Sequence, residues 1–265
     1  MTPIEGSCKS ALSQSHLPGL QYALNPYRGC AHNCTYCYAP FVLKINRQQW
    51  HQEIYVKRNI PQILTQELKK KKPGVVGLST VTDPYQPVEK KYQLTRQCLE
   101  LLFDYDFPVC IQTKSPLVLR DITLLSRFSN VEIMISIGTE KDHERILLEP
   151  GSPSISDRLS TVRTCAEAGI KTSVFFGPIY PTISTERVES IIDLFIEHGA
   201  SHIMIDSLHL RPELWETIKH SLEENEALLT VFSKYVLDIK NQYNAVKKQI
   251  QTYATKKKFE IVDAF

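Results

Sequence analysis

The chain has 265 residues, of which 42% are hydrophobic and 23% charged, and its formal net charge is +2 at pH 7. These values are typical of a globular protein with a large core, and the length suits a single α/β barrel. No apolar run approaches the roughly 20 residues that span a bilayer, and the start of the chain does not resemble an export signal. We therefore predict a cytoplasmic protein with no membrane partner. The net charge gives no argument for nucleic acid, although a local basic patch would suffice to bind it. The run Lys69–Lys72 is interpreted as solvated cations at a helix C-terminus, with nucleic-acid binding as the alternative.

The first 20 residues are polar and irregular, and a short strand at 21–24 leads from them into a loop with three cysteines. A strand at 54–57 and a helix at 60–72 are expected after this loop. From residue 73 onward, short apolar strands alternate with helices. The further expected strands are 75–79, 109–112, 131–137, 171–176 and 202–206, and the further expected helices are 89–103, 116–128, 154–168 and 186–198.

This alternation predicts βαβ units and a parallel sheet. Right-handed crossovers, repeated about six times, curl such a sheet into a partial or complete barrel. Apolar residues spaced by three and four from about 228 to 253 predict one long amphipathic helix, which we expect to cover the open edge of the barrel. The predicted organisation is a leader at 1–20, an α/β barrel core at 21–211 and a helical extension at 212–265.

The cysteine loop has the composition of a metal site. Cys30, Cys34 and Cys37 have the spacing Cys-x₃-Cys-x₂-Cys, in a stretch without apolar periodicity. Three thiolates are one fewer than the four that close a structural zinc site or saturate an ordinary iron–sulfur cluster. An open coordination position is where metal chemistry can occur. At this point a zinc site completed by His32 or Cys8 is the alternative interpretation.

The loop resembles the signature of the radical S-adenosylmethionine (SAM) superfamily. The longer string Asn-Pro-Tyr-Arg-Gly-Cys-x-His-x-Cys-x-Tyr-Cys-Tyr, at 25–38, resembles the spore photoproduct lyase-like branch. The resemblance implies a partial (β/α)₆ TIM-type barrel in which the three cysteines bind a [4Fe–4S] cluster and SAM chelates the fourth iron. It also implies that the reduced cluster cleaves SAM to a 5′-deoxyadenosyl radical, which abstracts hydrogen from a substrate. An electron donor such as a flavodoxin or ferredoxin is then required.

The same resemblance suggests which residues meet SAM. Residues 78–87 carry the Thr-Asp-Pro pattern of the branch, where the superfamily often has a Gly-Gly-Glu-like motif that holds the SAM amino group. This role is therefore assigned to Ser79, Thr80, Thr82 and Asp83. Two aromatic residues of the cysteine loop, Tyr36 and Tyr38, are also assigned to cofactor binding. A turn capped by short polar side chains is the alternative interpretation of 78–87.

Three further residues complete the predicted site. Lys114 follows the strand at 109–112 and faces the site, and Ser136 resembles the polar residue that meets the SAM ribose. Arg158 follows a Glu-Pro-Gly-Ser-Pro stretch at 149–153 and is predicted to pair with the SAM carboxylate in a charge-assisted fork. A solvent-exposed Arg158 is the alternative. No catalytic acid or base is assigned.

We therefore predict a radical SAM enzyme with lyase-like or modifying activity on an unidentified substrate. The chain departs from spore photoproduct lyase itself, because Ser79–Thr82 contains no hydrogen-donor cysteine and the chain is short with little basic excess. Repair of DNA is therefore not favoured. The alternative function is a zinc- or cluster-stabilised binding protein without SAM turnover. Cys98, Cys110 and Cys165 are interpreted as core residues, so a second cluster is not expected.

Overall fold

The computed structural model describes residues 2–264. Its strands are β1 (Thr2–Gly6), β2 (Leu12–Gln14), β3 (Tyr22–Leu24), β4 (Tyr27–Arg28), β5 (Glu53–Lys57), β6 (Val76–Leu78), β7 (Val109–Thr113), β8 (Val131–Ser136), β9 (Lys171–Phe176), β10 (His202–Ile205) and β11 (Glu260–Asp263). Its α-helices are α1 (Ala39–Val42), α2 (Arg47–Trp50), α3 (Ile60–Leu68), α4 (Glu89–Tyr92), α5 (Leu94–Asp104), α6 (Ile122–Leu125), α7 (Asp142–Leu148), α8 (Ile155–Glu167), α9 (Val188–Glu197), α10 (Pro212–Ser221), α11 (Glu226–Leu237) and α12 (Ile239–Lys257). Two 3₁₀ turns are η1 (Pro116–Asp121) and η2 (Thr185–Arg187). Within residues 2–264, no helix is long and apolar enough to cross a membrane.

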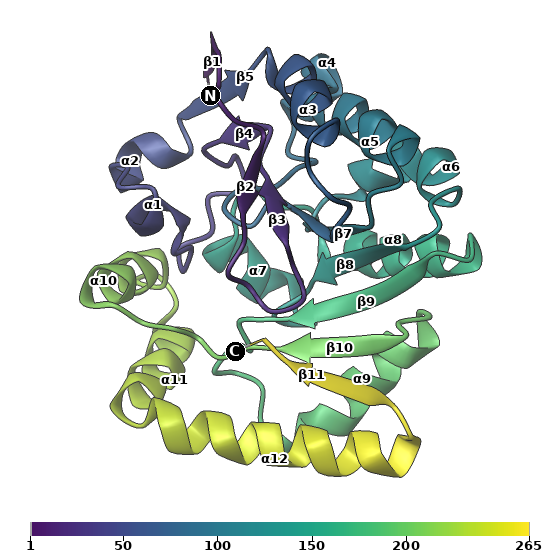
Figure 1. Cartoon of the computed structure of the whole chain (residues 1–265). Helices are drawn as coiled ribbons and strands as arrows, with labels where there is room; N and C mark the ends of the chain where they lie inside the picture. Colours follow the sequence, from purple (N-terminus) through teal and green to yellow (C-terminus); the bar gives the residue numbers. More distant parts are fainter. Residues whose placement is uncertain (1, 265) are drawn as a thin grey trace.

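Eight strands form one sheet in the order β11-β10-β9-β8-β7-β6-β3-β2 (Figure 1). Neighbouring strands from β3 to β11 pair in parallel, whereas β2 pairs antiparallel with β3. The six strands predicted for the barrel are β3, β6, β7, β8, β9 and β10. The predicted α/β fold with a parallel sheet is confirmed, and β2 and β11 are the two edges of the sheet.

Strands β7 to β9 show that the two faces of the sheet differ. Successive side chains on a strand point to opposite faces. Ile111, Ile133 and Val174 are fully buried in the core that the strands share with helices α5, α8 and α9. On the other face, Gln112 and Phe175 are only partly buried. Met134 and Ser173, which lie on the same face as Gln112, are buried, so this second face is mixed in character, whereas the first packs against α5, α8 and α9.

The first 20 residues are not the irregular leader that the sequence predicts. Strand β1 pairs in parallel with β5 in a separate sheet of order β1-β5-β4, and β2 forms the edge of the main sheet. Most side chains of β1 are exposed, so backbone pairing rather than a buried face holds this strand. A strand without a buried face has no alternating apolar pattern, which is why the sequence gives no signal for it.

Two predicted helices near the middle of the chain differ from the expectation. The predicted helix at 89–103 is divided into α4 and α5, because Gln93 adopts a left-handed φ of 51°. The predicted helix at 116–128 consists of η1 followed by the single turn α6. In both segments the apolar spacing continues across the irregularity, so periodicity alone does not reveal it.

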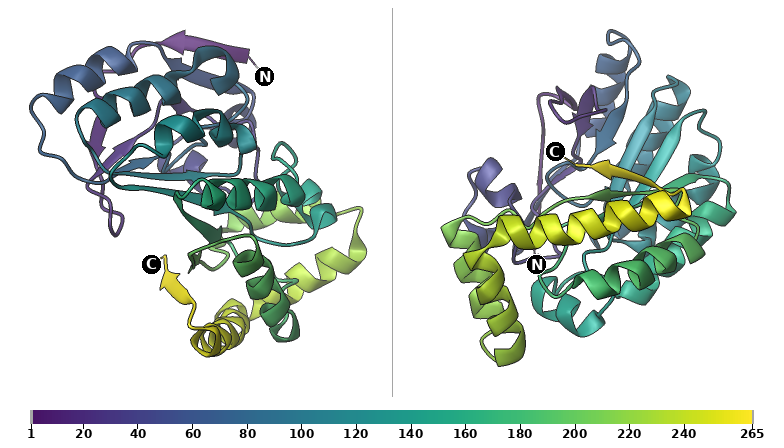
Figure 2. Two further views of the ribbon diagram at one scale, coloured as in Figure 1. Left: turned by 90° about the vertical axis from the view of Figure 1, so that its right-hand side faces the viewer. Right: turned by 90° about the horizontal axis from the view of Figure 1, so that it is seen from below.

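The C-terminal region also differs in detail. The predicted helix at 228–253 consists of α11 and α12, which meet at Asp238, and the longer of the two, α12, has 19 residues. Helix α12 lies beside α9 (Figure 2), where Tyr253 donates a 2.7 Å hydrogen bond to Asp193. Strand β11 pairs with β10 and is the edge strand here, and α12 contacts both β11 and α9, so the expectation that this helix covers the sheet edge stays a prediction. The division of the chain at residues 20 and 211 stays a prediction.

Candidate metal centre and cofactor site

The cysteine loop follows β4 and is held by the segment around α2. The backbone N–H of Cys30 donates to the carbonyl of Trp50 over 3.2 Å. The Arg47 guanidinium donates to the carbonyl oxygens of Cys37 and Cys34 at 2.9 and 2.5 Å. These bonds leave the thiols free while the backbone between them is fixed. Arg47 is therefore a support of the loop that the sequence did not reveal.

The three thiols lie in a buried setting. Cys30 and Cys34 are each 9% exposed, Cys37 is half-buried, and none of the three is in a disulfide. Burial raises the pKa of Cys34 to about 12 and also raises the pKa of Cys30 and of Cys37. The ionised forms of Cys34 and Cys37 further raise the pKa of Cys30, and that of Cys37 raises the pKa of Cys34. Metal binding here has to displace thiol protons.

The opposite side of the loop is held by the segment after α7. The N–H of Thr35 donates to Leu148 over 2.8 Å, and the N–H of Gly151 donates to the carbonyl of His32 over 3.0 Å. A side chain at Gly151 would overlap the backbone of Ala31, so glycine is required for this close approach. The cysteine loop is therefore clamped from two sides by backbone hydrogen bonds.

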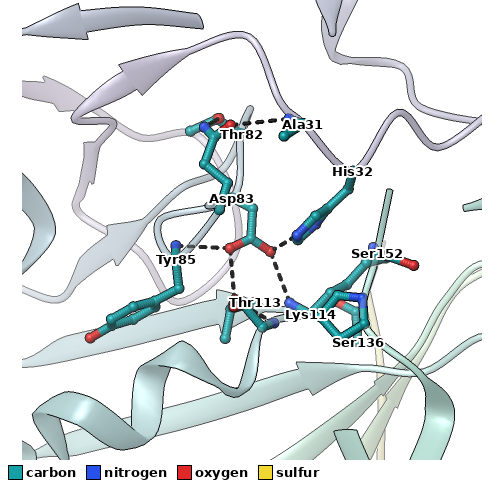
Figure 3. Close-up of polar contacts among 12 residues, drawn as sticks. Ala31, His32, Thr82, Asp83, Tyr85, Thr113, Lys114, Ser136 and Ser152 are labelled. Atoms are coloured by element: carbon teal, nitrogen blue, oxygen red, sulfur yellow. Dashed lines mark hydrogen bonds and ion pairs between the residues drawn. The ribbon is translucent and has the colours of Figure 1, made fainter. Parts of the chain in front are cut away.

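Asp83 joins the cysteine loop to the ends of two parallel strands (Figure 3). Its Oδ1 accepts hydrogen bonds from the Thr113 hydroxyl at 2.7 Å and from the N–H of Tyr85 at 2.9 Å. Its Oδ2 accepts from the N–H of Lys114 at 2.9 Å and lies 3.4 Å from Nδ1 of buried His32. This carboxylate, only 6% exposed, is thus surrounded by protein donors.

Thr82 has a similar supporting position. Its hydroxyl donates to the carbonyl of Gly29 at 2.6 Å. The Gln86 amide reaches the same carbonyl at 3.1 Å and accepts from the N–H of Ala31 at 3.0 Å. The Thr-Asp-Pro motif therefore holds the cysteine loop in this structure. Gln86 shares this function, and nothing in its local sequence signalled it.

Ser79 and Thr80 lie at the carboxyl end of β6. Ser79 is buried with a left-handed φ of 68°, and its hydroxyl has no hydrogen-bond partner among residues 2–264. The carbonyl of Thr80 accepts a 2.9 Å hydrogen bond from the hydroxyl of Tyr38, whose side chain is 51% exposed. Backbone strain and an unpaired buried hydroxyl at a strand end are features that concentrate at functional sites.

Arg158 is fully buried, so the alternative of a solvent-exposed arginine is wrong. It forms an ion pair with Glu149 and donates to the Ser152 hydroxyl at 2.5 Å and to the carbonyl of Ser136 at 3.0 Å. Glu149 also accepts hydrogen bonds from the hydroxyls of Tyr36 and, at 3.2 Å, Tyr180. The partners of Arg158 are thus groups of the protein. Glu149 and Ser152 lie only 9 and 6 residues from Arg158, whereas folding brings Tyr36 to Glu149 across 113 residues.

The electrostatics of this network favour charged forms. Burial alone raises the pKa of Glu149, but the Arg158 and Lys114 cations outweigh it and hold this pKa at about 2. Burial lowers the pKa of Lys114, but the ionised forms of Cys34 and Glu149 more than compensate and raise it above its ordinary value. Lys114 forms no salt bridge with any residue between 2 and 264, and its Nζ lies 5.9 Å from the centre of the Tyr36 ring. It is therefore a cation available to a ligand.

The predicted site residues thus meet at the carboxyl ends of the parallel strands. The family model of the radical SAM superfamily matches residues 24–236. The chain belongs to the radical SAM superfamily.

A protein of Methanocaldococcus jannaschii is 32% identical over 254 residues, which cover 93% of each chain. A radical SAM Nα-GlyT isomerase of Pseudomonas phage M6 is 27% identical and matches 87% of this chain, which spans about half of the phage protein (52%).

Solved structures of spore photoproduct lyase share the fold of this radical SAM protein. The complex with a dinucleoside spore photoproduct has a TM-score of 0.74 at 16% identity, and the match covers 99% of this chain and 82% of that one. A variant with bound SAM and the same type of ligand has a TM-score of 0.72 at 15% identity, with the same coverage. At these identities the likeness shows the fold alone.

Membership of the superfamily implies a [4Fe–4S] cluster and SAM, and the residues present fit them. The structure has eight unpaired buried side-chain polar atoms among residues 2–264, and four of them lie on or beside the cysteine loop or at the end of β6. These four belong to Thr35, Trp50, His51 and Ser79. Buried polar groups are normally hydrogen-bonded. The concentration of these four atoms near three free thiols therefore fits a site that binds a polar group such as the cluster and SAM.

The zinc interpretation has no support in the structure. No group of three Cys, His, Asp or Glu side chains between residues 2 and 264 is arranged to hold a single metal ion. His32, the proposed fourth zinc ligand, is directed to Asp83 (Figure 3), and Cys8 packs against the main core rather than the small cluster that contains Cys30 and Cys37. A cluster, in contrast, binds each thiolate at a separate iron and does not require the three sulfurs to surround one ion.

Proposed function

We propose that this chain is a SAM-cleaving enzyme whose Cys30, Cys34 and Cys37 hold a [4Fe–4S] cluster. When bound and reduced, the cluster supplies one electron for the cleavage of SAM to methionine and a 5′-deoxyadenosyl radical, which abstracts hydrogen from a substrate. The observation that carries this proposal is the set of three free thiols on one clamped loop, with four buried polar atoms on or beside it or at the end of β6 that have no hydrogen-bond partner among residues 2–264. A flavodoxin or ferredoxin is the proposed electron donor, and the proposed site of action is the cytoplasm.

The residues around the loop divide into supports and ligand-binding groups. Asp83, Thr82 and Arg158 bond to the protein and would orient the cysteine loop and the strand ends around it. We therefore assign the SAM carboxylate to Lys114, a cation that forms no salt bridge among residues 2–264, in place of Arg158. Ammonium and carboxylate groups form strong charge-assisted hydrogen bonds, and a partly buried site strengthens them.

Hydroxyl groups would meet the remaining polar parts of SAM. Ser79 has an unpaired buried hydroxyl at the end of β6. Ser136 is buried at the end of β8, where its hydroxyl has a weak 3.4 Å contact with Gln112. We propose that Ser79 binds the amino-acid part of SAM and that Ser136 binds the ribose. The half-buried Tyr36 ring would lie beside the cofactor, with its hydroxyl held by Glu149.

The direct test is SAM cleavage by the anaerobically reconstituted protein. After reduction with dithionite we expect methionine and 5′-deoxyadenosine to form in equal amounts, measured by liquid chromatography and mass spectrometry. Reactions without dithionite provide the control, because the cleavage consumes one electron per SAM. A protein with full iron and sulfide content that forms no 5′-deoxyadenosine would contradict the proposal.

Lys114→Met tests the assignment of the SAM carboxylate. A hydrogen bond to a charged group contributes about 1.5–3 kcal/mol, so we expect the Kd for SAM to rise roughly 10- to 100-fold. Iron and sulfide content should not change, because the Lys114 side chain does not support the loop. Titration of the reduced cluster signal with SAM measures the Kd, and chemical analysis measures the iron and sulfide content. Lys240→Met, at an exposed position of α12, is the matched control, and equal SAM affinity in the two variants would refute the assignment.

A further inference from the structure

Trp50 ends α2 and is 1% exposed. It does not belong to the main core. Its side chain packs in a small separate cluster with Cys30 and Ala39, and the partly buried Cys37 packs against the same cluster. The carbonyl of Trp50 accepts the 3.2 Å hydrogen bond from the N–H of Cys30. Trp50 is therefore tied to the cysteine loop by both its backbone and its side chain.

The indole Nε1 of Trp50 has no hydrogen-bond partner among residues 2–264. A buried tryptophan usually finds such a partner, and leaving a buried donor unpaired is unfavourable. The indole N–H can only donate, so the group that pairs with it has to be an acceptor. Thiolate and sulfide sulfurs are acceptors, and two of the three proposed cluster ligands pack in the same small cluster as the indole.

We propose that the Trp50 indole N–H donates a hydrogen bond to a sulfur of the bound [4Fe–4S] cluster or of its cysteine ligands and thereby tunes the cluster. The proposal rests on the cluster binding argued above. Hydrogen bonds to sulfur and solvent exposure both set the reduction potential of such clusters. The reduced cluster carries one more negative charge, so a donor stabilises it more than the oxidised cluster. Trp50 therefore raises the reduction potential and eases the electron transfer that precedes SAM cleavage.

The other unpaired donors near the loop are less specific. The hydroxyls of Thr35 and Ser79 can donate or accept, so SAM, water or sulfur would satisfy them equally. His51 is half-buried, and its Nδ1 can donate or accept, depending on the tautomer. Trp50 combines a donor-only group, near-complete burial and packing with the cysteines.

The chain contains only two tryptophans, Trp50 and Trp215, which allows a direct spectroscopic test. In protein with ¹⁵N-labelled indoles, pulsed electron paramagnetic resonance of the reduced cluster should show a ¹⁵N coupling. Trp50→Phe keeps an aromatic ring in the cluster but should abolish the coupling. Trp215→Phe is the matched control, because Trp215 packs against the main core rather than the cysteine cluster.

The reduction potential gives a second readout. In Trp50→Phe we expect the reduction potential of the cluster to become more negative. At a fixed applied potential, the ratio of reduced to oxidised cluster should fall up to tenfold. For a one-electron couple, a tenfold change corresponds to a shift of about 59 mV. Trp215→Phe should leave the potential unchanged.

If the wild-type protein holds a full cluster but shows no ¹⁵N coupling, the inference is wrong and cluster binding stands. If no cluster forms in the wild-type protein, the inference and the proposed function both fail. If Trp50→Phe does not fold, the ¹⁵N coupling in the labelled wild-type and Trp215→Phe proteins still tests the inference, because Trp50 is present in both.

Discussion

Cys34→Ala is expected to abolish cluster binding and, with it, all SAM cleavage. Two remaining thiolates cannot replace the three-cysteine set, and the neighbouring His32 is buried against Asp83. The anaerobically reconstituted variant should lack the [4Fe–4S]⁺ signal that the wild-type protein shows after reduction. In the wild-type protein this signal should shift when SAM is added, because under the proposed function SAM would chelate the open iron. Electron paramagnetic resonance and iron analysis measure both effects.

Cys8→Ala is the matched control for this loss. Cys8 is a half-buried thiol like Cys37, but its hydrogen bonds to Asn59 use only backbone atoms and survive the substitution. The variant should keep its cluster and its SAM cleavage. Loss of the cluster in Cys8→Ala would instead identify Cys8 as a fourth ligand, and retention in Cys34→Ala would remove the basis of every proposed cofactor contact.

Arg158→Met is expected to cost about 3–5 kcal/mol of the free energy of unfolding at neutral pH. The substitution leaves the Glu149 carboxylate buried without its cation, although the bonds from Tyr36, Tyr180 and Ser152 stay available. Urea unfolding of the metal-free protein measures the loss. Glu149 also neighbours the backbone bonds that hold the cysteine loop, so cluster content should fall as well.

The pH dependence of stability should report the same pair. The folded-state pKa of Glu149 is depressed from 4.5 to about 2, so its contribution is complete above the ordinary carboxylate range and is lost as the pH falls towards 2. In Arg158→Met this contribution should be absent, which flattens the acid side of the stability curve. Replacing Glu149 by leucine as well should recover part of the stability, because an apolar pair of similar volume avoids the buried charge.

A surface pair provides the comparison for Arg158→Met. Lys219 and Glu216 are 3.8 Å apart, and their side chains are 49% and 69% exposed. Exposed pairs of this kind contribute about 0–1 kcal/mol, so Lys219→Met should change stability little. If Arg158→Met and Lys219→Met have similar effects, Glu149 and Arg158 do not form the buried charge pair on which the site is built.

Much of the fold and the cysteine site could be predicted from short stretches of sequence. Strands β7 to β10 are short apolar runs separated by helices, and both patterns depend on neighbouring residues. Strand β1 was missed because its exposed side chains leave no such pattern. The break at Asp238 was missed because the buried stripe of α11 resumes in α12. Burial by distant parts of the chain, rather than local propensity, decides these features.

The sequence by itself determined which three thiols form the site, because Cys30, Cys34 and Cys37 lie within one loop and their Cys-x₃-Cys-x₂-Cys spacing indicates a metal site without reference to the rest of the fold. Only the tertiary structure decided what surrounds them. Asp83 is an anchor of the cysteine loop because folding places it beside His32, and Tyr36 joins the Glu149 network because folding brings the two together across 113 residues. A hydrogen bond or ion pair depends on where two distant backbones meet, and the residue types alone do not specify that meeting.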